Sequence, residues 1–280
     1  MRRRGFIAAG LAFAAMPARA GSSEGRKDRL VIKGAMEQGS LALGYAEPRA
    51  SVTVDGQKVR LSPDGVFAFG FGFDQTKPSI VVVTWSDGGI ETQSYAPALR
   101  QYEIQRVNGL PQNTVTPPPE ILARIKQEAE SIYLARQRDT AGEDFLSGFD
   151  WPAPGIESGV FGSQRIDNGV PMAPHFGVDM AAPTGTPIRA PADGMVSLSA
   201  DHYLNGGFTL IDHGQGVSTS YLHQSKRLVK DGDRIKRGQL IGEIGQTGRA
   251  TGPHLHWAMN WFEVKLDPSR STRKAKPDPL

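Results

Sequence analysis

The placement of the histidines constrains this chain more than any other feature. All six histidines lie beyond residue 170, and three of them occur in two short motifs, His175 with Asp179 and His254 with His256. Gly and Pro surround the first motif, which favours strand and turn over helix. On a strand, residues i, i+2 and i+4 share a face. His175 and Asp179 then project together, with Gly177 leaving room between them, and His254 and His256 project together from a second strand.

Two adjacent strands would bring these four side chains around one point. Neutral imidazoles and a carboxylate are what a catalytic zinc site uses, with three protein ligands and one open position. The spacing therefore predicts a domain with one zinc ion per chain. Because the chain has no cysteine, it has no disulfides, and its stability rests on packed cores.

The first 20 residues have the three parts of an export signal. A basic start (Arg2, Arg3, Arg4) precedes a short apolar stretch and a small-residue cleavage site at 18–20. We expect cleavage after Ala20 and a periplasmic or secreted protein. Residues 3–7 also resemble a twin-arginine signal, so the general secretory and twin-arginine routes both stay open. Since no stretch reaches the roughly 18 apolar residues of a spanning helix, we expect no transmembrane segment.

Removal of this signal changes the charge of the chain. The formal net charge is +3, but residues 1–20 hold four arginines and no acid, so the remainder carries +3 − 4 = −1. The basic character belongs largely to the signal and is no evidence for nucleic-acid binding. We expect no nucleic-acid partner.

The remaining sequence predicts a mainly β fold in two domains. Residues 28–105 contain short alternating strands with turns such as Asp55-Gly56, which is typical of a small, immunoglobulin-like β-sandwich. Its phenylalanines recur at every second position from Phe67 to Phe73, which indicates a core face; a carbohydrate-stacking platform is the alternative.

A connector and a second β-domain follow. Residues 106–150 form the linker, with a helix at about 119–138 whose apolar face is Ile121, Ile125, Ala129 and Ile132. Residues 151–268 have repeated Gly and short alternating strands, typical of a β-roll or antiparallel sheet. Residues 269–280 lack an apolar pattern, and we expect a disordered basic tail.

Four ordered motifs resemble the M23 family of zinc metallopeptidases, the LytM or lysostaphin-type endopeptidases of bacterial cell walls. The motifs are residues 158–165, 175–187, 220–223 and 248–257, and the resemblance covers about residues 155–268. It implies that His175, Asp179 and His256 bind zinc and that His223 and His254 form the catalytic pair. Either histidine of the pair could be the general base.

The groove residues are less clearly marked by the sequence. Tyr221 lies two residues before His223 and could hold substrate, with a core aromatic as the alternative. Arg165 and Asn168 precede the first ligand and could line the groove, with solvated loop residues as the alternative. His202 and His213 have no ligand spacing and are interpreted as turn histidines.

The resemblance implies an endopeptidase that cuts peptide cross-links between peptidoglycan stem peptides. A D,D-type bond is the expected target, with glycyl-glycine bridges as the alternative. A non-catalytic LytM-type activator of other wall hydrolases is the rival function, although such members typically lose metal ligands. Residues 229–242 also resemble lipoyl and biotinyl carriers, but no modifiable lysine tripeptide is present. We expect a monomer, and an unidentified activator is left open.

Overall fold

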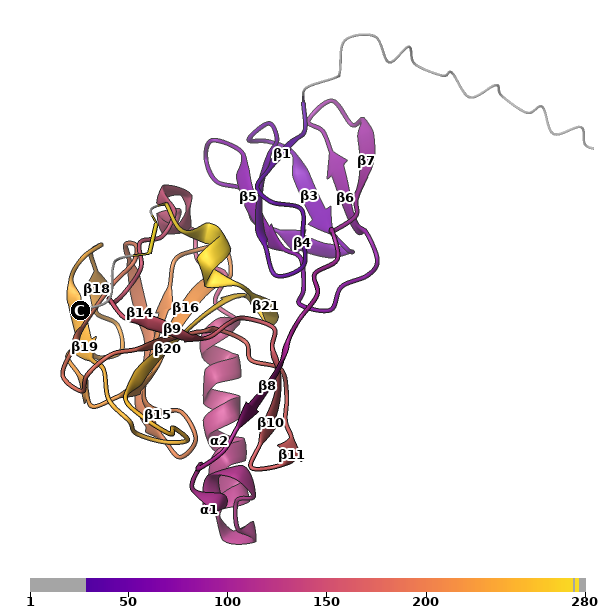
Figure 1. Cartoon of the computed structure of the whole chain (residues 1–280). Helices are drawn as coiled ribbons and strands as arrows, with labels where there is room; N and C mark the ends of the chain where they lie inside the picture. Colours follow the sequence, from indigo (N-terminus) through magenta and orange to yellow (C-terminus); the bar gives the residue numbers. More distant parts are fainter. Residues whose placement is uncertain (1–28, 274, 277–280) are drawn as a thin grey trace, which may run out of the picture.

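A computed structural model describes residues 29–273 and 275–276 of the 280-residue chain. The predicted export signal and its cleavage site after Ala20 lie outside the described residues. The fold is mainly β, as the sequence predicts, in a smaller and a larger domain (Figure 1). Among the described residues, no helix is both long and apolar enough to cross a membrane.

The smaller domain consists of two antiparallel sheets. Their strand orders are β1-β2-β5 and β4-β3-β6-β7. Asp55 and Gly56 both have positive φ and close the β3–β4 hairpin, as an Asp-Gly pair does in a two-residue turn. The strands are β1 (Val31–Lys33), β2 (Leu41–Tyr45), β3 (Ser51–Val54), β4 (Gln57–Val59), β5 (Val66–Gly70), β6 (Ser79–Thr84) and β7 (Ile90–Tyr95).

The phenylalanine stripe belongs to the core. Phe67, Phe69 and Phe71 are fully buried. The rings of Phe67 and Phe69 stack and Phe69 meets Phe71 edge to face, which leaves no exposed face for a carbohydrate. All five residues of β5 are buried, because the opposite face of this strand packs against the larger domain. At Gly70 an added Cβ would lie 2.8 Å from Leu266 Cδ2, so the two domains touch there without a gap.

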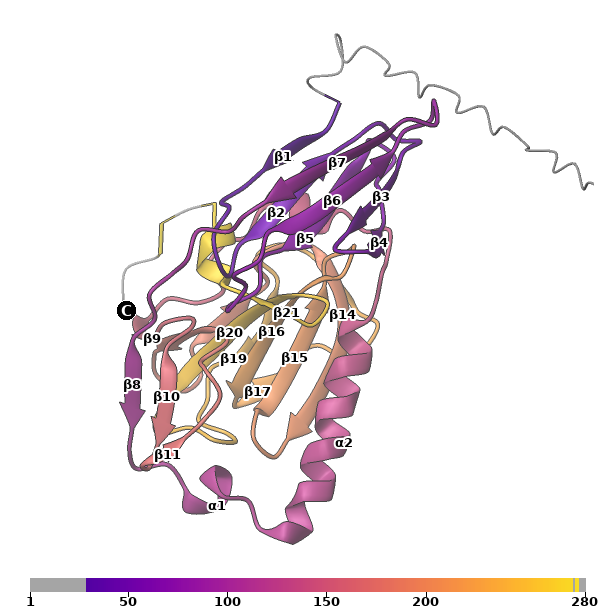
Figure 2. The same cartoon turned by 90° about the vertical axis from the view of Figure 1, so that its right-hand side faces the viewer.

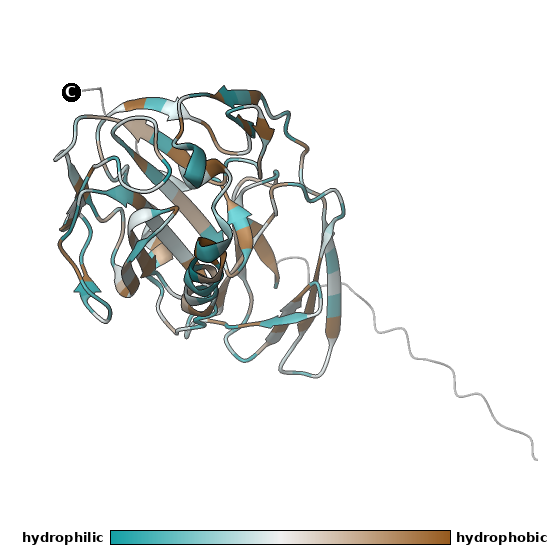
Figure 3. Cartoon of the chain, turned by 90° about the horizontal axis from the view of Figure 1, so that it is seen from below, coloured by the Kyte–Doolittle hydropathy of each residue, from teal (hydrophilic) through white to brown (hydrophobic). Residues whose placement is uncertain are grey.

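The larger domain is built on one long, largely antiparallel sheet. Its order is β18-β14-β15-β16-β20-β12-β9, with β21 paired to β20, and a second sheet has the order β13-β19-β17. Figure 3 shows hydrophobic residues along the sheet strands. The strands are β9 (Ile156–Gly159), β12 (Val178–Ala181), β13 (Pro187–Arg189), β14 (Gly194–His202), β15 (Gly206–Asp212), β16 (Val217–Gln224), β17 (Lys226–Arg227), β18 (Arg234–Ile235), β19 (Leu240–Glu243), β20 (His254–Trp261) and β21 (Val264–Leu266).

The connector is more ordered than the sequence indicates. Strand β8 (Ile104–Val107) pairs in parallel with β10 (Gln164–Asp167), which pairs with β11 (Val170–Pro171). The expected linker start at residue 106 is therefore wrong, since residues 106 and 107 belong to a strand. A parallel partner almost 60 residues away leaves no local signal. Figure 2 shows β8 and β10 beside one edge of the central sheet and the main helix at the other.

Two helices follow β8. The first is the single turn α1 (Gln112–Val115), and the second is α2 (Pro119–Arg136), where the sequence predicts a helix at about 119–138. Proline at the first helical position suits the start of α2, because its missing N–H has no partner there in any helix. Ile132 and Ala135 of α2 pack on Phe208 and Leu210 of β15. The connector helix is thus attached to the larger domain.

The prediction of a disordered tail from residue 269 is wrong for residues 269–273. A 3₁₀ turn, η2 (Pro268–Ser271), follows β21, and another, η1 (Asp144–Ser147), precedes the larger domain. Thr272 forms a bridge with Phe149, and the Arg273 guanidinium forms an ion pair with Asp150 at 2.9 Å. These contacts involve residues more than 100 positions away, so the local polarity of the tail does not reveal them.

A buried glutamine joins the domains. Gln215, which is 3% exposed, accepts a hydrogen bond from the Ala68 N–H at 3.1 Å and donates one to the Val66 carbonyl at 3.2 Å. Both partners are backbone groups of β5. The side chain therefore supplies the Ala68 N–H with an acceptor, while the Val66 carbonyl also accepts from the Ser62 N–H at 2.8 Å.

We expect Gln215→Ala to lower the free energy of unfolding by about 2 kcal/mol, because it leaves the buried Ala68 N–H unpaired and removes the second hydrogen bond to the Val66 carbonyl. Urea unfolding followed by tryptophan fluorescence measures this change. Gln112→Ala removes an exposed glutamine and should stay within about 0.5 kcal/mol of the parent. Equal unfolding midpoints for the parent and Gln215→Ala would show that the two bonds contribute nothing to domain docking.

Candidate metal centre

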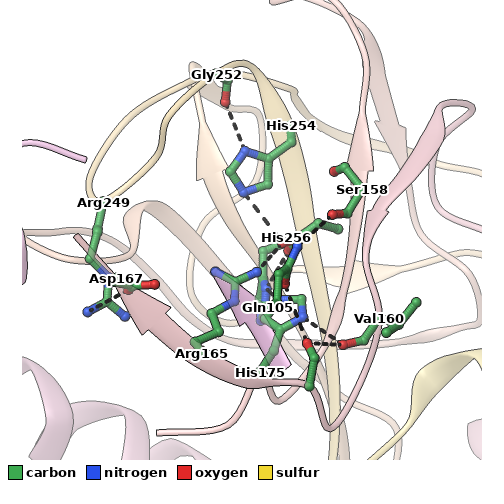
Figure 4. Close-up of polar contacts among 12 residues, drawn as sticks. Gln105, Ser158, Val160, Arg165, Asp167, His175, Arg249, Gly252, His254 and His256 are labelled. Carbon is green, nitrogen blue, oxygen red and sulfur yellow. Dashed lines mark hydrogen bonds and ion pairs between the residues drawn. The ribbon is translucent and has the colours of Figure 1, made fainter. Parts of the chain in front are cut away.

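Three side chains from two paired strands and the loop before them converge on one point. His175 precedes β12, Asp179 lies on β12, and His256 lies opposite Asp179 on β20. His175 Nε2, Asp179 Oδ1 and His256 Nδ1 are 2.8–2.9 Å apart in each pairing. Within the described ranges, these residues form a group able to hold a metal ion. Figure 4 shows the two histidines beside Arg165.

The protonation states suit metal binding. Burial raises the pKa of Asp179, but the charges of His175 and His256 and hydrogen bonds from their rings outweigh it and hold that pKa well below its usual range. Burial lowers the pKa of His256 to about 4, partly offset by Asp179. At pH 7 the carboxylate is ionised and the His256 ring is neutral, which is the form that coordinates metal.

The surrounding backbone orients the three side chains and lets them lie close enough together to bind one small cation. The carbonyl of Val160 can only accept, so the 3.0 Å contact places a proton on His175 Nδ1 and leaves Nε2 as the ring atom that faces the other two donors. At Gly177 an added Cβ would lie 2.6 Å from the His256 ring, and at Gly159 it would lie 2.4 Å from Asp179 Oδ2. Tetrahedral zinc separates ligand atoms by about 3.3 Å, so the donors need move apart by only about half an ångström.

Two further histidines lie beside this group. The rings of His223 and His254 are 4.7 Å apart between centroids, and that of His223 is 6.3 Å from His256. His223 Nδ1 contacts the Thr247 carbonyl at 2.8 Å, and His254 Nδ1 contacts the Gly252 carbonyl at 2.9 Å. Since carbonyls only accept, each of these Nδ1 atoms carries a proton, and the Nε2 atom of His254 lies 3.9 Å from Asp179 Oδ1.

The environment of His223 is unusual in two respects. Burial, followed by the charges of His254 and His256, lowers its pKa to about 3, so the ring is neutral at pH 7. Its backbone has φ +63°, a conformation that costs a non-glycine residue free energy and is enriched at functional sites. A pKa this low makes the free ring a weak base, so His223 takes up a proton only where a developing negative charge beside it stabilises the imidazolium.

The three predicted groove residues lie in three different environments. Arg165 Nη2 donates to Asp179 Oδ2 at 2.5 Å, so this residue contacts the metal group itself. Tyr221 is fully buried with its hydroxyl on Thr219, and its prediction as a substrate contact is wrong. The prediction of Asn168 as a groove residue is also wrong. Its side-chain amide accepts from the Leu110 N–H and donates to the Leu110 carbonyl, which holds the segment before α1 against the β10–β11 turn.

His202 and His213 stay outside the metal group. His213 is buried between the Asp193 carbonyl and the Thr219 hydroxyl, and His202 stacks on Phe208. The sequence did not single out Arg249, which lines a cleft beside Asp179 and His254 together with Gln105 of β8. The sequence contains no local pattern that marks Arg249, because this cleft is formed by segments from three distant parts of the chain.

Comparison with known proteins gives a consistent result. Residues 173–268 match the model of Peptidase family M23. Over 88 residues the chain is 49% identical to the peptidoglycan DD-endopeptidase ShyA of Vibrio cholerae, which is 31% of this chain and 20% of that protein. It is 37% identical over 150 residues to an uncharacterized metalloprotease of Haemophilus influenzae, covering 50% of this chain and 31% of that protein.

The chain thus spans between a fifth and a third of the length of these two curated relatives. A similarity over most of the fold comes from a crystal structure of an M23 peptidase protein from Pseudomonas aeruginosa. It has a TM-score of 0.66 at 28% identity and covers 85% of this chain and 95% of that one. The similarity therefore includes the smaller domain as well as the metal centre.

Proposed function

Because the chain belongs to peptidase family M23 through residues 173–268, we propose that it is a zinc metalloendopeptidase that hydrolyses peptide cross-links of bacterial peptidoglycan. One observation carries this proposal. Three metal-type donors from His175, Asp179 and His256 converge, and the rings of His223 and His254 lie beside them. This combination supplies ligands and proton-transfer groups together, which a purely structural metal site does not need.

The residues divide the chemistry among them. A zinc ion would be held by His175, Asp179 and His256, one per chain, and would supply a Lewis acid for the scissile carbonyl and for water. One ring of the His223–His254 pair accepts the proton of the attacking water on Nε2. The protonated ring donates a hydrogen bond to the tetrahedral oxyanion and then returns that proton to the leaving amine as the C–N bond breaks. Arg165 holds the second oxygen of Asp179 and orients that ligand.

The proposal also specifies which bond of the cross-link is cut and in which compartment the protein acts. The curated relative in Vibrio cholerae is named as a peptidoglycan DD-endopeptidase, which supports a D,D-type bond over a glycyl-glycine bridge for this chain. The signal-like residues 1–20 support export to the periplasm or beyond. We expect the protein to act as a monomer, and its need for an unidentified activator stays an open prediction. No observation in the described residues favours the activator alternative.

We expect the zinc-loaded mature chain, residues 21–280, to convert cross-linked muropeptide dimers of purified sacculi into monomers. Mass spectrometry of the released fragments identifies the bond, and a parallel reaction on pentaglycine-bridged sacculi tests the glycyl-glycine alternative. Protein treated with a chelator serves as the control and should leave the dimers intact. If fully zinc-loaded protein leaves both kinds of cross-link intact, the hydrolase function is wrong and the activator function gains support.

A further inference from the structure

A groove runs along the sheet away from the metal centre. It has a volume of about 330 Å³ and begins at the metal-binding side chain of His256. Its floor includes Ala258 and Asn260, which follow His256 at every second position of β20 and so share its face. Its wall is α2, through Ile132 and Tyr133 among others. A peptide lying in this groove would extend from the metal centre along β20.

Two cations and one carboxylate close the far end of this groove. Arg136 is the last residue of α2, and Lys265 lies on β21 opposite Asn260. Both side chains are largely buried, with 14% and 27% exposed, and both line the groove. Glu263 is the acidic partner of both, at 3.8 Å from Arg136 Nη1 and 3.9 Å from Lys265 Nζ. These distances are longer than a charge-assisted hydrogen bond.

The positive charge at this end is only partly compensated. Glu263 is 43% exposed and also accepts a hydrogen bond from Gln137 at 3.4 Å, so water and a third donor share its charge. Among the described residues, the buried Nε of Arg136 has no hydrogen-bond partner. Asn260, with its amide oxygen turned toward Lys265, accepts from Nζ at 3.3 Å, but it is neutral. Burial, and then the charge of Arg136, lowers the pKa of Lys265 to about 8.

We propose that Arg136 and Lys265 bind a free carboxylate of the substrate peptide at the far end of this groove. The proposal rests on the proposed function, because it treats the groove as the substrate channel. A carboxylate there would accept hydrogen bonds from two kinds of donor. The planar guanidinium of Arg136 can bind both carboxylate oxygens, and the compact ammonium of Lys265 can bind from any direction. It would also supply the second negative charge that two largely buried cations lack.

The length of the groove determines which carboxylate is meant. Asn260 lies four positions after His256, which is about 13 Å along a strand at roughly 3.3 Å per residue. An extended peptide with its scissile bond at the metal centre therefore places a group three to four residues away beside Lys265. Peptide stems with acidic residues offer a carboxylate at that distance, whereas an all-glycine bridge offers none. The pair would thus select an acidic stem.

The test uses synthetic cross-linked stem peptides in matched pairs that differ at a single carboxylate, either free or amidated. For the pair that differs three to four residues from the scissile bond, we expect kcat/KM of the zinc-loaded mature protein to be at least tenfold higher on the free form. Lys265→Met should bring this ratio to within threefold of one, mainly by raising KM on the free form. Arg136→Gln should do the same, with thermal unfolding measured to confirm that it is folded.

Lys226→Met is the matched control, since Lys226 also pairs with a glutamate at 3.9 Å but lies on β17, outside the groove lining. It should keep the parent ratio. If the parent cuts free and amidated forms equally well, or if Lys265→Met slows both equally, the carboxylate site is wrong while the hydrolase function stands. If the parent cuts neither form, the hydrolase function itself fails.

Discussion

Replacing His175 or Asp179 by alanine is expected to remove the bound zinc from the purified mature protein. Each residue supplies one of three donors whose atoms lie 2.8–2.9 Å apart, and two donors hold zinc far more weakly than three. Metal analysis after dialysis should give about one zinc per chain for the parent and less than about a tenth of that for either variant. Hydrolysis should be lost in parallel.

His202→Ala provides the matched control for these variants. His202 is equally buried, at 6% exposed against 4% for His175, but it stacks on Phe208 away from the metal centre. This variant should keep its zinc. Full zinc retention by both His175→Ala and Asp179→Ala would rule out the proposed ligand set.

His223→Ala and His254→Ala should keep their zinc and lose hydrolysis by about 100-fold or more, the usual effect of removing an acid–base group. Neither ring belongs to the group of three converging donors, and each directs its proton to a backbone carbonyl. Metal content and turnover of a cross-linked muropeptide, measured on the same preparation, separate the two roles.

The comparison variant for this pair is His256→Ala, which should lose both zinc and activity. A variant of His223 or His254 that loses zinc as completely as His256→Ala would have to be reassigned as a ligand. A variant that keeps both zinc and full turnover would have no catalytic role. The two histidines need not be equal, because His223 is more deeply buried and has its pKa lowered to about 3.

The metal donors were predictable because short-range spacing places them. On paired strands, alternate residues share a face, so Asp179 and the His254–His256 pair project toward a common side once β12 and β20 pair. His175 was expected on the same strand, but it lies in the loop before β12, and the tertiary fold brings it to Asp179. Gly177 was expected to leave room between ligands, and an added Cβ there would indeed meet the His256 ring. The β-sandwich was predictable for the same reason. The Asp55-Gly56 turn and the phenylalanines at every second position are patterns within a few residues of one another.

The contacts that frame the site were decided by tertiary structure alone. Tyr221 has the right residue type and position for a substrate contact, yet the packing of the sheet buries it completely. Arg165 was one loop residue among several until the fold placed its guanidinium on Asp179.

The groove beside the metal centre is also formed only by the tertiary structure. Arg136 and Lys265 lie 129 positions apart on a connector helix and a β-hairpin, and neither belongs to a motif. Local patterns determine which residues share a face of an element, because that depends on backbone geometry over a few residues. Which faces meet depends on long-range packing, and the wall of this groove exists only because α2 docks on β15 through Ile132 and Ala135.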